Sequence, residues 1–398
     1  MESSFANGVL FLLLVAAVVA MLTRRLALPY IVGLVAAGMA LTLLRHAPKI
    51  ILTRDLIFDA LLPPLIFEAA FYLRWEQLRR ELPLILTLAS VGVILSGAVT
   101  AVGMHFLAGW QWATAATFGA LIAATDPVSV IATFREAKVH GRLRLLIEAE
   151  SLLNDGTAAV AFGAAVLFTT GHALTGLGLA TNLLAVVGGG VACGVAVAGA
   201  AVFLTGRTED HLIELTFTTV AAWGSFFLAD RLDFSGVFAT IVAGLILGNR
   251  GELGLLSGRG REAVQVFWEY AAFVANSFVF LLIGIRVAAQ DFAAVWLLCL
   301  IAIAFVFLGR AFAVYPLCAL FGRSRLRVTS PHQHILFWGG LRGALALALA
   351  LGLPEDLPER GQIVTVSFAV VAFSIFVQGL TMSPLLRLMR RYVGAEPE

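Results

Sequence analysis

Charged residues are scarce in this sequence: Asp, Glu, Lys and Arg make up 13% of its 398 residues, whereas hydrophobic residues make up 60%. A soluble chain of this length needs a polar exterior, and so few charges cannot provide one. Together with a mean hydropathy of +0.94, this scarcity excludes an ordinary soluble enzyme and predicts a protein whose surface faces lipid. The formal net charge of +2 points to no particular partner, and we expect no nucleic-acid partner.

Cysteine and histidine are also rare, and neither forms a metal-binding pattern. Cys193, Cys299 and Cys318 lie in apolar runs without metal or redox spacing, so we interpret them as packing residues. His332 and His334 lie near a predicted cytoplasmic end, where interfacial histidines are more typical than a metal site. The sequence therefore predicts no cofactor.

A positively charged segment ahead of the first apolar run is missing. Arg24 and Arg25 follow this run, Phe5 to Leu22, instead of preceding it. A signal peptide has the reverse arrangement. We therefore expect a retained first span with its N-terminus outside the cell.

Long apolar runs fill the rest of the chain. A membrane-spanning helix needs about 17–25 apolar residues, and cutting the sequence at glycine, proline and charge clusters predicts thirteen spans. Most of the 27 basic residues then fall on one side, which the positive-inside rule makes cytoplasmic. This pattern predicts a multi-pass protein of the cell inner (plasma) membrane with a cytoplasmic C-terminus. The predicted spans are residues 6–23, 29–44, 51–73, 82–108, 111–134, 145–170, 179–205, 211–230, 234–249, 263–285, 292–322, 332–353 and 362–386.

An odd number of spans allows an internal repeat. If the seventh span, about 179–205, is a connector, spans 1–6 and 8–13 form two six-helix halves of opposite orientation, at about 6–170 and 211–386. The sequence of 30–41 resembles that of 236–248, although two unrelated glycine-spaced helices would look the same. Inverted repeats are the usual plan of secondary transporters, which bind their substrates between broken helices. We predict one membrane transport domain over residues 1–386 and a short cytoplasmic tail over 387–398.

Asp126 is one of few ionisable residues at membrane depth, where each needs a partner, a water-filled cavity or a function. Pro127 follows it, frees the carbonyl of Ala123 and pushes Asp126 away from helical angles. Such a break places main-chain carbonyls, including that of Thr125, beside a carboxylate, a mixture that suits a hard monovalent cation. The alternative is a proline kink in which Asp126 only caps the following half-helix.

Span 6 carries four polar side chains on one face. Glu150 and Asn154 are four residues apart, as are Ser151 and Asp155, so all four project over neighbouring parts of the helix surface. A polar seam between helices explains the hydroxyl and the amide, but it does not explain two acids in hydrocarbon. This face is therefore a second candidate for ion binding.

Arg342 lies in the middle of span 12 among glycines that loosen the helix. In the repeat scheme span 12 corresponds to span 5, so we expect the two breaks to face each other. A buried guanidinium must be paired, and we predict that Glu68 in span 3 is its partner, in a structural network with Asn154. For the other acids and arginines near predicted span ends we expect snorkelling or interfacial ion pairs; these are Asp59, Glu148, Glu214, Glu269, Arg286 and Arg310.

Four segments in this order resemble the monovalent cation:proton antiporters of the sodium/proton exchanger branch, whose prokaryotic members are called NhaP-type. The resemblance implies an all-α fold of thirteen helices, crossed unwound helices at spans 5 and 12, and a homodimer with elevator-like alternating access. The four segments are Leu62–Ala70 (LPPLIFEAA), Thr125–Val128 (TDPV), Glu150–Thr157 (ESLLNDGT) and Gly339–Ala344 (GGLRGA).

The resemblance also implies roles for individual residues. Asp126 and Asp155 would bind the cation together with Ser151 and the carbonyl of Thr125, while Glu150 acts at the edge of the site. Asn154 stands where a second aspartate would mark other members, which resembles the electroneutral branch that exchanges one cation for one proton.

Competition for two carboxylates provides the mechanism. Two such groups close together cannot both stay ionised at low cost without a counter-charge, which either a sodium ion or a proton supplies. Exchange follows if the empty site cannot cross the membrane. We therefore predict a Na+(Li+)/H+ antiporter that is not an enzyme. The alternatives are a K+/H+ antiporter, a cation channel with an acidic ring, and an intramembrane aspartyl protease with Asp126 and Asp155 as its dyad.

Overall fold

The computed structural model describes residues 2–393 except 27, 45–47, 49, 51, 138, 140, 170–175, 206–209 and 251–257. Every regular element in these residues is a helix, as expected for a chain that crosses lipid. Eight of the described helices are long and apolar enough to span a membrane. They cover residues 6–26, 75–108, 142–169, 181–205, 211–231, 260–287, 293–320 and 360–389, and shorter apolar helices cover 30–43, 112–122 and 236–249.

The chain divides into two compact units. One unit contains Met1–Arg54, Pro83–Gly171 and Ser277–Glu398, and the other contains Asp55–Leu82 and His172–Asn276. Two helices contribute residues to both units, namely α4 (Trp75–Thr87) and α12 (Gly258–Val287). The two interrupted helices of the candidate ion site both belong to the first unit.

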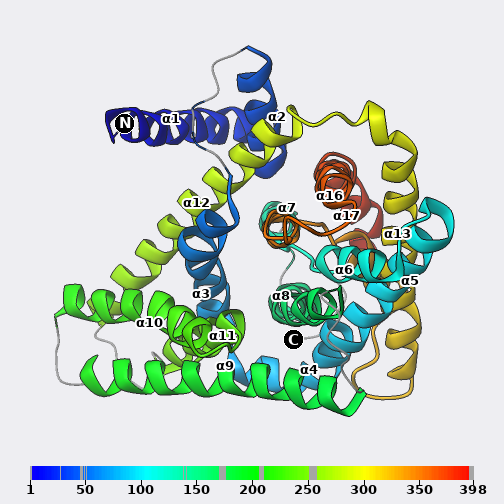
Figure 1. The fold of residues 1–398 in the computed structure, drawn as a ribbon. Helices are drawn as coiled ribbons and strands as arrows, with labels where there is room; N and C mark the ends of the chain where they lie inside the picture. The colour runs from blue at the N-terminus through cyan, green and yellow to red at the C-terminus, as the bar shows by residue number, and fades with distance from the viewer. Residues whose placement is uncertain are drawn as a thin grey trace. The chain divides into compact units, whose positions relative to one another are not determined.

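In the second unit, α11 packs against α3, α9 and α10 (Figure 1). Its core contains Phe67 and Trp268, whose ring centroids are 4.4 Å apart. The indole N–H of Trp268 donates to Thr218 Oγ1 at 3.1 Å, so the polar group of this buried ring is satisfied. Besides most of α12, the elements of this unit are η1 (Leu56–Leu61), α3 (Leu62–Tyr72), α9 (Gly176–Thr205), α10 (His211–Arg231) and α11 (Gly236–Arg250).

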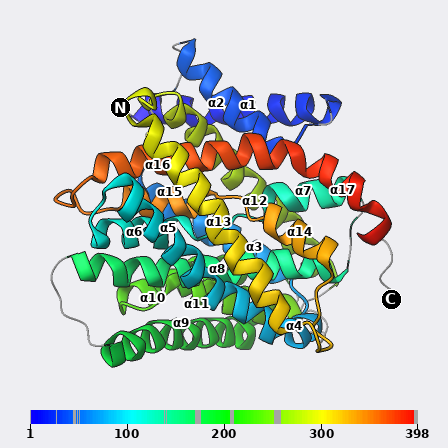
Figure 2. The same cartoon turned by 90° about the vertical axis from the view of Figure 1, so that its right-hand side faces the viewer.

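In the first unit, α5 packs along α13 and α6, and α6 packs along α8 (Figure 2). In one of these contacts, Gly97 of α5 lies against the carbonyl of Gly119 on α6. The elements of this unit are α1 (Glu2–Leu26), α2 (Tyr30–Leu43), η2 (Leu88–Gly92), α5 (Val93–Ala108), α6 (Trp112–Ile122), α7 (Val128–Ala137), α8 (Arg142–Thr169), η4 (Ala293–Val295), α13 (Trp296–Leu320), α14 (Ser330–Trp338), α15 (Ala344–Leu351), α16 (Arg360–Phe373), η5 (Ser374–Gly379) and α17 (Leu380–Val393).

Two of the predicted spans, 111–134 and 332–353, are each divided into a pair of short helices. The first becomes α6 and α7, and the second becomes α14 and α15. The residues between each pair, 123–127 and 339–343, are not helical. The interruptions fall at Pro127 and at the glycines of span 12, where the sequence predicts them.

The structure corrects the expectation for one ionisable residue. Arg310 lies near the middle of α13 and is 7% exposed, so the expectation that it lies at an interface is wrong. Glu214 lies in the first turn of α10, where the helix dipole favours an acid, and is 1% exposed. Glu148 forms a partly exposed ion pair, with Arg144. The last helix, α17, extends from the predicted end of the last span at residue 386 to Val393.

Candidate ion-binding site

The two interrupted helices meet at their extended segments. The backbone N–H of Asp126 donates to the carbonyl of Leu341 at 2.7 Å, and the two residues form an isolated antiparallel bridge. In a continuous helix these main-chain groups would form hydrogen bonds within the helix. Non-helical backbone at membrane depth needs other partners, and this pairing provides them. The breaks therefore face each other, and the contact fixes the backbone on which the Asp126 side chain is mounted.

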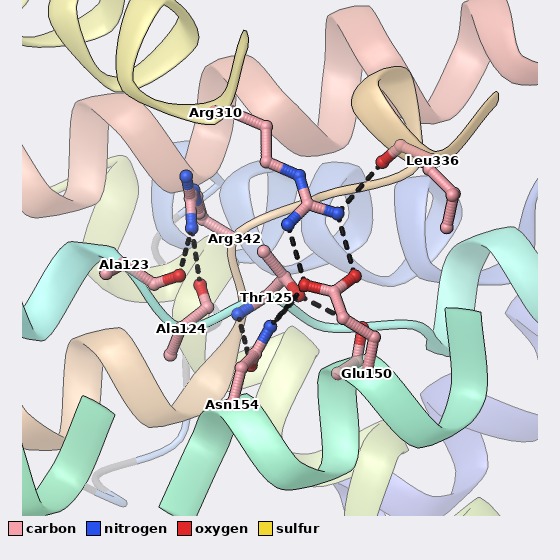
Figure 3. A network of polar contacts seen from close by, with 9 residues as sticks. Ala123, Ala124, Thr125, Glu150, Asn154, Arg310, Leu336 and Arg342 are labelled. Atoms are coloured by element: carbon pink, nitrogen blue, oxygen red, sulfur yellow. Dashed lines mark hydrogen bonds and ion pairs between the residues drawn. The ribbon is translucent and has the colours of Figure 1, made fainter. Parts of the chain in front are cut away.

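Arg342 compensates the break that Pro127 creates. Proline has no N–H to donate to the carbonyl four residues earlier, which is that of Ala123. The guanidinium of Arg342 donates through Nη1 to this carbonyl, and also to the carbonyl of Ala124 at 3.0 Å (Figure 3). Its positive charge thus lies at the C-terminal end of α6, where the helix dipole favours a cation.

The partners described for Arg342 are main-chain carbonyls, and the residue is 2% exposed. The sequence also suggests an ion pair with Glu68, which belongs to α3 in the other compact unit and is partly buried. That pairing stays a prediction. The need of the broken backbone for a strong donor is a second reason for a buried guanidinium at this position.

Asp126 caps α7 and faces the crossing at the same time. Its Oδ1 accepts the N–H of Val128 at 2.9 Å, so the capping role considered as an alternative does occur. Its Oδ2 lies against Gly343, where an added Cβ would collide with the carboxylate. Gly343 has an extended backbone, so its small size is the property that this position requires. Because an ionised carboxylate has about four lone-pair sites, capping leaves capacity for a cation.

Helix α8 presents its predicted polar face to the break in span 5. The hydroxyls of Thr125 and Ser151 are 3.0 Å apart. The side-chain amide of Asn154 binds Thr125 twice, accepting the backbone N–H at 3.1 Å and donating to Oγ1 at 2.6 Å. All three residues are at most 1% exposed. Asn154 therefore acts as a fixed tie between α8 and the interrupted helix.

Asp155 completes the group on α8. It is partly buried, and its carboxylate lies within electrostatic range of both Asp126 and Glu150. The two aspartates predicted to share a site are thus close enough to interact. Around them are hydroxyl and carboxylate oxygens, which are the ligands that hard cations prefer.

A buried ion pair that the sequence did not predict holds Glu150. Arg310 donates to its Oε1 at 2.7 Å and to its Oε2 at 2.8 Å, a bidentate arrangement (Figure 3). Arg310 Nη2 also donates to the carbonyl of Leu336 at 2.9 Å, and Asn154 donates to Glu150 Oε1 at 3.1 Å. The signal that could have found this pair is the predicted span 292–322 itself, because residue 310 lies close to its centre.

Within the described centre, five ionisable side chains interact with one another. Three are carboxylates and two are guanidinium groups, so the fully ionised centre carries one net negative charge. In a low-dielectric interior such a charge is costly. The centre is therefore one monovalent cation, or one proton, short of neutrality. The five residues are Asp126, Glu150, Asp155, Arg310 and Arg342.

Comparisons with known proteins identify the family. The model of the family "Sodium/hydrogen exchanger, transmembrane" matches residues 10–388. This chain belongs to the sodium/hydrogen exchanger family.

Relatives of this exchanger-family chain include two cyanobacterial proteins. It is 37% identical over 377 residues to the Low-affinity Na+/H+ antiporter NhaS1 of Synechocystis, covering 93% of this chain and 71% of the relative. It is also 37% identical over 361 residues to the Na+/H+ antiporter ApNhaP of Aphanothece halophytica, covering 90% and 69%. The fold is similar to the structure of the sodium proton antiporter MjNhaP1 from Methanocaldococcus jannaschii at pH 8, with a TM-score of 0.79 and 20% sequence identity. The match covers 99% of this chain and 100% of that chain. The exchanger-family fold is thus shared over the length of the chain.

Proposed function

We propose that this chain is a Na+(Li+)/H+ antiporter, a secondary transporter in which one cation and one proton compete for Asp126 and Asp155. The observation that carries this proposal is the crossing of the two interrupted helices, where Asp126 is fixed by Leu341 and interacts with Asp155. Membership of the exchanger family supports it, and the curated relatives described above are named Na+/H+ antiporters. The same membership argues against the channel and protease alternatives.

The proposed cation ligands are the carboxylates of Asp126 and Asp155, the hydroxyl of Ser151 and the main-chain carbonyl of Thr125. Glu150 was expected to act at the edge of this site. We instead assign it a structural role, because both of its carboxylate oxygens are held by Arg310. The sodium or lithium ion is the transported substrate here, and no cofactor enters the proposal.

The charge of the centre favours exchange of one cation for one proton. Glu150 and Arg310 form an ion pair, and the guanidinium of Arg342 adds one positive charge against the two aspartates, so a single further positive charge makes the whole centre neutral. The centre with a bound cation or a bound proton then has no net charge, so its movement through the bilayer carries no penalty for an uncompensated charge. The empty centre keeps one net negative charge, and its movement carries that penalty. Asn154 contributes no charge and keeps this balance. Electroneutral antiport follows.

Two equivalent helix contacts support the inverted repeat. Gly38 of α2 lies against the carbonyl of Leu281 on α12, and Gly244 of α11 lies against the carbonyl of Phe67 on α3. In the proposed repeat, the second helix of each half thus contacts the third helix of the other half through a glycine. This reciprocity is what two halves related by a pseudo-two-fold axis would produce.

The proposed architecture extends to the membrane and to a second copy. The helices lie over the predicted span ranges, which supports thirteen crossings. The excess of basic residues on one side supports an outer N-terminus and a cytoplasmic C-terminus in the cell inner membrane. The proposal has a single transport domain over 1–386, with repeats at 6–170 and 211–386, a connector at 179–205, and a tail from 387 that begins as a continuation of α17. The resemblance to NhaP-type exchangers supports a homodimer with elevator-like alternating access.

Ion flux into sealed vesicles tests this function directly. Purified protein is reconstituted with a preformed proton gradient, and Na+, Li+ or K+ is added outside with and without an imposed membrane potential. Na+ and Li+ are expected to collapse the gradient at a rate that does not change with the potential. A rate that follows the potential would contradict one-for-one exchange. A response to K+ alone would favour a K+/H+ antiporter, and a cation current without proton movement would favour a channel.

A further inference from the structure

The last long helix contains a π-helical turn beside the ion site. This turn, η5 (Ser374–Gly379), joins α16 to α17 in one continuous helical stretch. Isolated π turns within α-helices are frequent at functional sites, because the extra residue changes the direction of the side chains. Two of its polar side chains, Ser374 and Gln378, are only 1% and 3% exposed.

Both side chains bind main-chain groups at the interruption in span 12. Ser374 Oγ accepts the N–H of Arg342 at 3.0 Å, and its own O–H can donate to the carbonyl of Arg342 at 3.2 Å or to that of Val371 in its own helix at 3.0 Å. Gln378 Nε2 donates to the carbonyl of Trp338 at 2.9 Å. The turn therefore clamps the last residue of α14 and, four residues later, the non-helical Arg342, with Leu341 between them.

A small cavity lies on this side of the segment. It has a volume of about 10 Å³, room for roughly one water molecule. Ser374 and Gln378 line it together with Gly340 and Arg342 of the interruption. The two polar side chains therefore lie beside the open backbone, where their hydrogen bonds help to fix it.

We propose that Ser374 and Gln378 are positioning residues for cation binding. They fix the segment whose Leu341 carbonyl holds the backbone of Asp126, and whose Arg342 guanidinium holds the carbonyls that precede Thr125. Neither residue is among the proposed cation ligands. The inference rests on the proposed site at Asp126 and Asp155, and it predicts that the clamp sets the affinity of that site for Na+.

Transport kinetics in reconstituted vesicles test this role. Ser374→Ala and Gln378→Leu are each expected to raise the apparent KM for Na+ about fivefold, the factor that corresponds to the loss of one buried hydrogen bond. The maximal rate per folded protein is expected to stay within about twofold of wild type, because the ligands themselves remain. Ser374→Thr keeps the hydroxyl and is expected to restore the wild-type KM.

Ser367→Ala is the matched control for the serine variant. Ser367 is fully buried two turns earlier on the same helical stretch, and its hydroxyl donates to the carbonyl of Ile363, its one hydrogen-bond partner among the described residues. It removes the same group without touching the interruption, so its KM is expected to equal that of wild type. If Ser374→Ala yields no folded protein, Gln378→Leu at the other end of the clamp decides the question by the same measurement.

Two results would overturn the positioning role. One is a KM for Na+ that is unchanged in both clamp variants, and the other is an equal rise in Ser367→Ala. Asp155→Asn is measured in parallel to keep the two proposals apart. If Asp155→Asn is inactive while the clamp variants keep the wild-type KM, only the clamp fails; if Asp155→Asn transports like wild type, the site itself fails.

Discussion

Replacing Asp155 with asparagine is expected to reduce Na+-dependent proton exchange to the level of empty vesicles. Asparagine keeps the size of the side chain but removes the charge that Na+ and the proton must share. It also leaves the Glu150–Arg310 pair and the Asn154 tie in place, because Asp155 takes part in neither. The measurement is the initial rate of gradient collapse after Na+ addition, normalised to the amount of folded protein.

Asp126→Asn is expected to give the same loss without unfolding the protein. Asn is as good an N-cap residue as Asp, so the bond to the N–H of Val128 can be kept. Glu148→Gln on α8 is the matched control, because Glu148 lies near Asp155 in sequence but pairs with Arg144 at partial exposure. Its rate is expected to match wild type. Exchange at the wild-type rate in Asp155→Asn would refute the assignment of the site.

Replacing Arg310 with alanine is expected to have the largest effect on stability. It would leave the carboxylate of Glu150, which is 1% exposed, buried without its bidentate partner. Breaking such a pair typically costs about 3–5 kcal/mol, a large part of the stability of a single domain. We expect a lower Tm and a lower yield of detergent-purified protein.

Neutralising Glu150 as well shows how much of the lost stability comes from the unpaired charge and how much from the lost packing of the Arg310 side chain. The double variant with Arg310→Ala and Glu150→Gln no longer buries an unpaired charge, so part of the lost Tm is expected to return. Arg144→Ala is the control for an ion pair that is partly exposed, whose loss should cost only about 0.3–0.5 kcal/mol. If Arg310→Ala had the same Tm as Arg144→Ala, the buried Arg310–Glu150 pair would not contribute to stability as proposed.

The sequence was sufficient to place both breaks. Proline and glycine act on the backbone locally, so Pro127 and the glycines around Arg342 indicate an interruption without knowledge of the neighbours. The helical period in the same way put Glu150, Ser151, Asn154 and Asp155 on one face, and three of them are linked to the break or to one another in the structure. Predictions of this kind need only residues that are close together in the sequence.

Pairing between distant residues was harder to predict. Arg310 and Glu150 are 160 positions apart in the sequence. By charge alone, Arg310 or Arg342 could pair with Glu150 or with Glu68. In the structure, Arg310 binds a carboxylate, and Arg342 binds two carbonyls at the break, one of which, that of Ala123, the proline leaves without a donor. Such a division depends on where helices cross, which no local pattern encodes.

The clamp on η5 escaped prediction for a related reason. Ser374 and Gln378 lie in the turn η5, whose six residues (SIFVQG) include no proline and no charge that would indicate a functional position. Their importance arises from the open backbone of another helix that lies beside them. A serine and a glutamine in an apolar span are otherwise read as ordinary polar residues bonded to their own helix.

Proton release on Na+ binding tests the competition between the two ions most directly. Na+ is added to the purified protein in weak buffer over a range of pH, and the protons released and the Na+ bound are counted together. We expect one proton to be released for each Na+ bound wherever the site starts protonated, and no Na+ binding in Asp155→Asn. Na+ binding that releases no proton at any pH would contradict a shared site.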